Sequence, residues 1–106
     1  MKQLTYDEVL KLSYPQLGAI DDPMTLMASG GMAPMAVRYL VRTGQLDESY
    51  PGVSLSALVK ALTEAAAQFP WPADVTQELP SGSRSEACDS YLSELRPRVR
   101  QRLGLN

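Results

Sequence analysis

Histidine is absent from these 106 residues, and cysteine occurs once, as Cys88. Without histidine, neither a Ser-His-Asp triad nor a Cys-His pair can form, and the commonest general base near neutral pH is missing. One cysteine excludes a disulfide within the chain and leaves Cys/His zinc sites without enough ligands. The sequence therefore predicts a protein that is not an enzyme, with no catalytic, cofactor-binding or metal-binding residues.

Long apolar runs are also missing. No stretch approaches the ~20 residues that cross a bilayer, and the N-terminus lacks the apolar core of a signal peptide. Apolar residues make up 44% of the chain and charged residues 21%, with a formal net charge of −2. This balance excludes a disordered, highly charged tail. We expect one cytoplasmic helical domain over residues 1–106, with no membrane span and no cofactor.

β-Branched residues are scarce, which decides the fold class. Valine and isoleucine together number eight, against 26 for leucine and alanine. Leucine and alanine lose little side-chain freedom in a helix, whereas β-branched residues fit pleated strands. No segment alternates apolar and polar residues over six positions, and no Asn-Gly or Asp-Gly marks a hairpin. The prediction is an all-α fold, a small bundle of four to five helices.

The first helix is expected over residues 6–13. Thr5 and Glu8 have the S/T-x-x-E spacing of a capping box, in which each residue bonds the backbone of the other. The residue before a proline disfavours helical geometry, so Pro15 is expected to end this helix.

Two further helices are expected before residue 45. Asp22-Pro23 combines a carboxylate cap with a proline in the first turn, and Gly30-Gly31 should end that short helix. A third helix is expected over residues 35–43, ended by Gly44 in a left-handed cap.

The second half of the chain predicts two long helices. Ser54 caps a strongly amphipathic helix over residues 55–69, and residues 73–82 are expected to form a loop with at most one irregular turn. Ser83 and Glu86 form a second S/T-x-x-E spacing, which opens a basic amphipathic C-terminal helix within residues 83–106. Its apolar stripe continues in phase across Pro97, so we expect a helix kinked at that proline.

The first candidate surface combines a methionine cluster with the third helix. Four of the five methionines lie close together in the chain, and methionine adapts to irregular partners as readily as it fills irregular core gaps. Only two arginines make the helix of residues 35–43 polar, so it lies either at the bundle centre or beneath a partner. The core interpretation is favoured for both features. If a partner packs there instead, the contacting residues are Met32, Met35, Arg38, Tyr39 and Arg42.

The second candidate surface is the arginine-rich C-terminal segment. From Arg84 onward the chain carries five arginines against three acidic residues, whereas the preceding part has a net charge of −4. Arginines flank both sides of the apolar stripe, a pattern that suits an anionic partner. The alternative is that these cations stabilise their own helix C-terminus and pair with acidic loops. The candidate contacts are Arg96, Arg98, Arg100 and Arg102.

Residues 34–46 resemble the second helix and exit of helix-turn-helix proteins, and residues 4–9 resemble an opening helix. The segment between them is longer than the three-to-four-residue turn of that motif, and a sequence pI near 5.0 opposes a basic DNA-reading face. We claim no family from this resemblance.

These observations favour a helical protein that acts by occupying the surface of another protein, as an adaptor, assembly chaperone or inhibitor. Such small acidic proteins are often phage or operon accessories. A small DNA-associated accessory protein is the alternative, using the helix of residues 35–43 or the arginine segment. A homo-oligomer remains open, and the sequence does not identify the partner.

Overall fold

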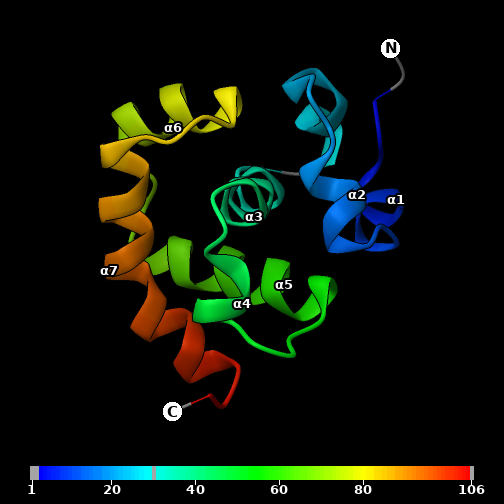
Figure 1. Cartoon of the computed structure of the whole chain (residues 1–106). Coiled ribbons are helices and arrows are strands. Elements are labelled where there is room, and N and C mark those ends of the chain that lie inside the picture. Colours follow the sequence, from blue (N-terminus) through cyan, green and yellow to red (C-terminus); the bar gives the residue numbers. More distant parts are fainter. Residues whose placement is uncertain (1–2, 30, 106) are drawn as a thin grey trace.

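The computed structural model describes residues 3–29 and 31–105, and all regular structure in those two stretches is helical. Figure 1 shows α-helices and 3-10 helices gathered around one helix, α3 (Ala33–Arg42), which is seen nearly end-on. The all-α prediction is confirmed. The described part of the chain also contains short helices, so it has more helical elements than a simple bundle of four to five helices.

The N-terminal segment forms two helices where one was expected. α1 (Tyr6–Leu10) begins with the predicted capping box, because the Thr5 side chain accepts from Glu8 N and the Glu8 carboxylate accepts from Thr5 N. α1 ends at Leu10, and α2 (Tyr14–Gly18) follows with its own capping box. Pro15 therefore lies in the first turn of a helix, where its missing N–H costs nothing. The prediction that Pro15 follows a helix ending near residue 13 is wrong.

The next elements are a 3-10 helix, η1 (Pro23–Ser29), and α3. Met24 N donates to the Asp22 side chain at 2.9 Å, so the predicted carboxylate cap is confirmed. α3 begins two residues before the expected start, and Gly44 has a φ of 75°, as a left-handed helix end requires. Gly30, half of the expected helix break, lies outside the described residues.

α4 (Leu46–Ser49) is a four-residue helix that the sequence did not predict, and α5 (Leu55–Gln68) is the helix predicted with most support. Ser54 caps α5 by accepting from Ala57 N at 3.3 Å. The apolar side of α5 is buried along its length, with Leu58, Val59 and Leu62 fully covered.

The expected loop over residues 73–82 is wrong. This segment forms α6 (Ala73–Glu78) and η2 (Leu79–Ser81), because Val75 and Leu79 lie one helical turn apart and are both buried. Burial of this pair stabilises the helix despite the flanking prolines.

α7 (Glu86–Arg102) is the long C-terminal helix. Its N-cap is Ser85, which accepts from Cys88 N at 3.2 Å, so the predicted capping box of Ser83 and Glu86 is wrong. The helix runs through Pro97 without interruption. Its predicted stripe is buried at five positions: Cys88, Tyr91, Leu92, Leu95 and Val99.

α3 is the centre of the core. α1, α2 and η1 lie on one side of it in Figure 1, α6 and α7 lie on the other, and α5 crosses below. All residues of α3 from Ala33 to Leu40 are buried, including Arg38. This agrees with the favoured interpretation that a helix with so narrow a polar stripe lies at the bundle centre.

Candidate functional site

The five residues predicted to contact a partner on the third helix have very different exposures. Met35 is 3% exposed, and Arg38 and Tyr39 are fully buried. Met32 is half-buried and Arg42 is exposed. A partner cannot reach the three buried side chains in this structure, so the core alternative describes them and we do not retain α3 as a docking face.

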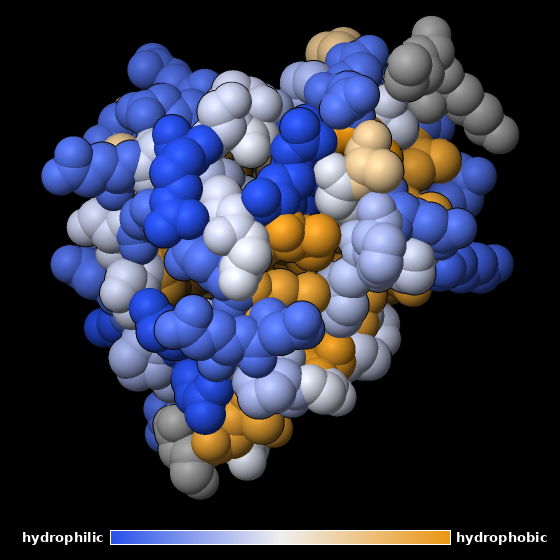
Figure 2. All heavy atoms as spheres, in the orientation of Figure 1, coloured by the Kyte–Doolittle hydropathy of each residue, from blue (hydrophilic) through white to orange (hydrophobic). Residues whose placement is uncertain are grey.

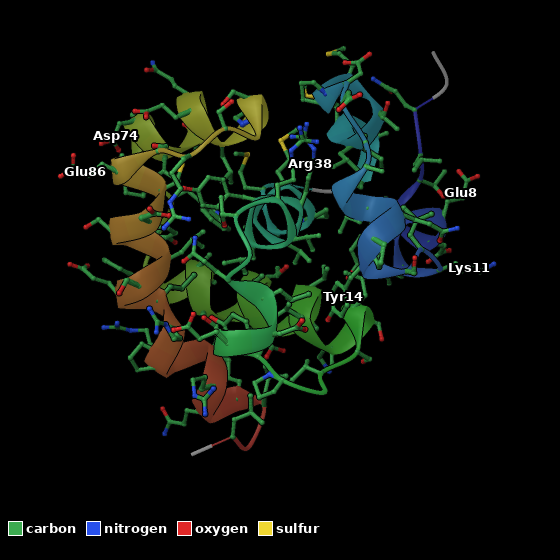
Figure 3. All side chains as sticks on the ribbon, in the orientation of Figure 1. Glu8, Lys11, Tyr14, Arg38, Asp74 and Glu86 are labelled. Atoms are coloured by element: carbon green, nitrogen blue, oxygen red, sulfur yellow. The ribbon has the colours of Figure 1, made fainter. Side chains whose placement is uncertain are left out.

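Arg38 connects α3 to two distant segments by bonding their main chains. Its Nε donates to the carbonyl of Ile20 at 2.6 Å, one terminal nitrogen to Asp21 O at 3.1 Å and the other to Pro80 O at 3.0 Å. Figure 3 shows the side chain pointing from α3 into the space between α6 and η1. Desolvation and the neighbouring charge of Arg42 lower the pKa of Arg38, against the opposing carboxylates of Asp21 and Asp22. Arg38 therefore links α3 to the segment after α2 and to Pro80.

Arg42 reinforces this connection from the surface side. It donates to Gly18 O at 3.0 Å and forms an ion pair with Asp21 at 3.4 Å. Gly82 packs against both guanidinium groups, since a Cβ there would lie 3.0 Å from Arg42 Nε and 3.1 Å from an Arg38 nitrogen. With a φ of 73°, Gly82 fits this corner for both steric and conformational reasons.

Tyr39 forms a polar network at the start of α7. Its hydroxyl donates to Asp89 Oδ1 at 2.7 Å and accepts from Ser85 N at 3.0 Å. Asp89 also accepts from Gln45 and Arg84. Desolvation raises the pKa of Asp89, but these hydrogen bonds and the Arg84 charge outweigh it and hold that pKa below its ordinary value. The network fixes the connection between α3, α4 and α7.

Cys88 and Ser85 carry nucleophilic atoms at the start of α7. The Cys88 thiol is fully buried, and desolvation raises its pKa, which favours the unreactive protonated form. Ser85 is also buried, and its hydroxyl donates to Glu78 Oε1 at 2.6 Å while it caps α7. Neither group has both the access and the base that nucleophilic catalysis needs.

The arginine segment divides into two pairs along α7. Arg96 and Arg100 are half-buried, and Arg100 donates to the carbonyls of Ser49 and Leu105. Arg98 and Arg102 are exposed, and Arg98 lies 5.0 Å from the centre of the Phe69 ring. Within the described part of the chain, none of the four forms an ion pair, so the expected pairing with acidic loops is not seen there.

An apolar groove opens where α2, the end of α3 and α4 meet. It has a volume of about 310 Å³. Figure 2 shows hydrophobic atoms at the base of a hollow in the middle of the face, in the region between α2 and α4 of Figure 1. The lining residues are Tyr14, Pro15, Val41, Gly44, Leu46 and Asp47.

A hydrogen bond and a close helix contact fix the walls of the groove without covering it. Tyr14, the first residue of α2 and labelled in Figure 3, donates its hydroxyl to Val53 O at 2.7 Å. Gly18 brings α2 against α3, because a Cβ there would lie 2.5 Å from Val41 Cγ1. Desolvation and the nearby Asp47 carboxylate raise the pKa of Tyr14 to about 12, so the phenol is neutral.

One acidic residue, Asp47, lines the groove. Asp47 and Glu48 are both exposed on α4. In residues 3–29 and 31–105, neither carboxylate forms an ion pair. An apolar side chain could therefore enter the groove beside the uncompensated negative charge of Asp47.

Sequence reasoning missed this groove. Ser13 and Gln16 form a capping box that could have located α2, but four residues of α4 are too few for a periodic pattern. Val41 was placed on the apolar side of its helix without a reason to expect an open groove above it.

In the described stretches, no three His, Cys, Asp or Glu side chains are grouped to hold a metal ion, and no helix is long and apolar enough to cross a membrane. Comparison of the chain with protein-family models, curated proteins and solved structures finds no match.

Proposed function

We propose that this chain is a non-enzymatic interaction protein whose groove between α2 and α4 binds a segment of another protein. The observation that carries the proposal is an open apolar groove with the exposed carboxylate of Asp47 in its lining. Its volume is near the lower end of the range for small-molecule pockets, about 300–1,000 Å³. It has room for one or two side chains, which is typical of peptide recognition rather than of enclosure of a metabolite.

The chemistry of the groove specifies the bound segment. Val41 and Leu46 line it with apolar surface, which favours an aliphatic or aromatic side chain. Asp47 lies on its edge, so a lysine or arginine next to that apolar residue would find an opposite charge. The proposed partner therefore carries an exposed segment in which an apolar residue adjoins a basic one.

Selection of displayed random peptides on the immobilised protein tests this proposal. Enriched peptides should pair an apolar residue with lysine or arginine. Asp47→Lys should weaken their binding at least tenfold, about 1.4 kcal/mol, because an attraction becomes a repulsion. Glu86→Lys is the matched control, since it makes the same change of charge at an exposed position on α7 that does not line the groove.

The proposal fails if no such peptides are enriched, or if Asp47→Lys and Glu86→Lys weaken binding equally. Asp47 is exposed, so its replacement should leave thermal unfolding within about 0.5 kcal/mol of the parent. Sedimentation of the free protein decides the remaining alternative, a homo-oligomer.

A DNA-associated role is the second candidate, because Arg98 and Arg102 are exposed without a carboxylate partner in the described residues. Duplex DNA binding should then weaken steeply between about 50 and 200 mM salt as counterions are released. Replacing both arginines by glutamine should reduce the salt slope by about two. Absence of binding at the lower salt concentration would remove this candidate.

The same proposal includes a specific role for the protein, its location in the cell and the kink at Pro97. An adaptor, assembly chaperone or inhibitor would each use the groove to cover a partner segment, and a cytoplasmic location suits a protein with one unpaired thiol. The kink predicted at Pro97 would set the direction of the exposed arginines relative to the first half of α7.

A further inference from the structure

The exposed methionines of η1 form a feature that the proposed function does not use. Met24 is 52% exposed and Met27 is 57% exposed, whereas Met35 is 3% exposed. With Tyr6, they are the large apolar side chains that the described part of the chain leaves exposed. Met32 is half-buried in a slot beside Trp71.

η1 presents the two thioethers on one side. In a 3-10 helix, residues three apart eclipse each other, and a rise of about 2.0 Å per residue separates their Cα atoms by about 6 Å along the axis. Between them, Thr25 and Leu26 are buried, and Leu4 N donates to Thr25 O at 2.8 Å. The helix is therefore anchored by its buried residues, while Met24 and Met27 are each more than half exposed.

We infer that Met24 and Met27 form a modification site that peroxides oxidise to sulfoxide ahead of the core methionine, and that this modification leaves the fold intact. The sulfur forms a bond to one peroxide oxygen as the O–O bond breaks. With hydrogen peroxide, the proton on the transferred oxygen passes to the departing hydroxide, which leaves as water. Sulfur loses two electrons and the peroxide gains them.

Oxidation changes the surface and spares the core. A sulfoxide is polar, so the reaction converts into polar groups two of the three large apolar side chains that are exposed in residues 3–29 and 31–105. Because Met24 and Met27 are each more than half exposed, we expect the burial of Leu26 and Thr25 to be kept. The change persists until a methionine sulfoxide reductase reverses it. Figure 1 places η1 above α3 and α4 below it, so the groove is separate from this site.

Treatment with hydrogen peroxide followed by peptide mapping tests the inference. Sulfoxide should form at Met24 and Met27 at least about tenfold faster than at Met35, as exposure dictates. The midpoint of urea unfolding should stay unchanged after the fast phase. The double variant Met24→Leu, Met27→Leu should lose this fast oxidation, and the single variant Met32→Leu should retain it.

Equal rates at Met27 and Met35 would overturn the inference, and so would a fall in the unfolding midpoint that accompanies the fast phase. The test is independent of the groove. Peptides selected on the groove should bind the oxidised protein as tightly as they bind the parent. If the selection enriches no peptides, the proposed function fails but the expected oxidation rates do not change.

Discussion

Replacing Tyr39 by phenylalanine should destabilise the protein through the polar network alone, because the buried ring remains. The variant loses a 2.7 Å hydrogen bond to a carboxylate and leaves Ser85 N without its acceptor. A bond to a charged group contributes about 1.5–3 kcal/mol, and an unsatisfied buried donor costs about 1–3 kcal/mol. Asp89 keeps its bonds from Gln45 and Arg84, so its charge stays compensated. We expect a loss of about 2–4 kcal/mol in the free energy of unfolding.

Urea unfolding followed by circular dichroism measures this loss at neutral pH. Tyr91→Phe is the matched control, because its hydroxyl bonds one neutral carbonyl, that of Phe69. That variant should lose about 1 kcal/mol. The reasoning is refuted if Tyr39→Phe stays within about 0.5 kcal/mol of the parent, the range of ordinary surface substitutions.

The same pair of proteins gives a dependence on pH with a defined sign. The pKa of Asp89 is lowered in the folded protein, so its stabilisation is present above the unfolded value of about 3.9 and disappears as pH falls through the folded value. The difference between the parent and Tyr39→Phe should therefore be constant near neutrality and shrink below about pH 4. A difference that grows in acid would contradict the network.

Three other measurements test the fold. Arg38→Lys should cost about 2–4 kcal/mol, seen as a lower urea midpoint, because one ammonium cannot reproduce a fork that bonds three carbonyls. Gly18→Ala should lower the melting temperature despite a gain in helix propensity of about 1 kcal/mol, since its Cβ would lie 2.5 Å from Val41 Cγ1; an unchanged melting temperature would contradict the close packing of α2. Burial raises the pKa of four tyrosines from 10.0 to about 12: Tyr14, Tyr39, Tyr50 and Tyr91. The stability that these neutral phenols contribute is therefore lost as pH rises from about 10 to about 12. In an alkaline titration, their phenolate absorbance should appear late and together with unfolding.

Local signals predicted the helices that carry them. The capping box at Thr5, the cap at Ser54 and the left-handed Gly44 are all in the structure, because each depends on residues only a few positions apart. The error at Pro15 arose because the same residue pattern is compatible with two structures. Pro15 can follow a helix or occupy its first turn, and the nearby capping box decides for the second.

The candidate site was harder to predict, because tertiary contacts decide it. Arg38 belongs to the narrow polar stripe of the third helix, and a fully buried arginine is rare unless its charge and donors are satisfied. Its acceptors belong to Ile20, Asp21 and Pro80, which are 17 to 42 positions away, and no local pattern reveals them. The groove combines three helices in the same way. A sequence pattern can place Val41 on a helix face, but only packing decides whether a neighbour covers it.

The bonds of Arg38 also affect how the protein opens. One side chain bonds the backbone after α2 and the backbone of η2, so these distant segments share an anchor on α3. A fluctuation that withdraws the guanidinium releases both at once, and local unfolding of either becomes part of one cooperative event. The first helices and the corner before α7 should therefore exchange their amide hydrogens with similar free energies. A buried cation in this position should therefore couple the opening of the segment after α2 to that of η2.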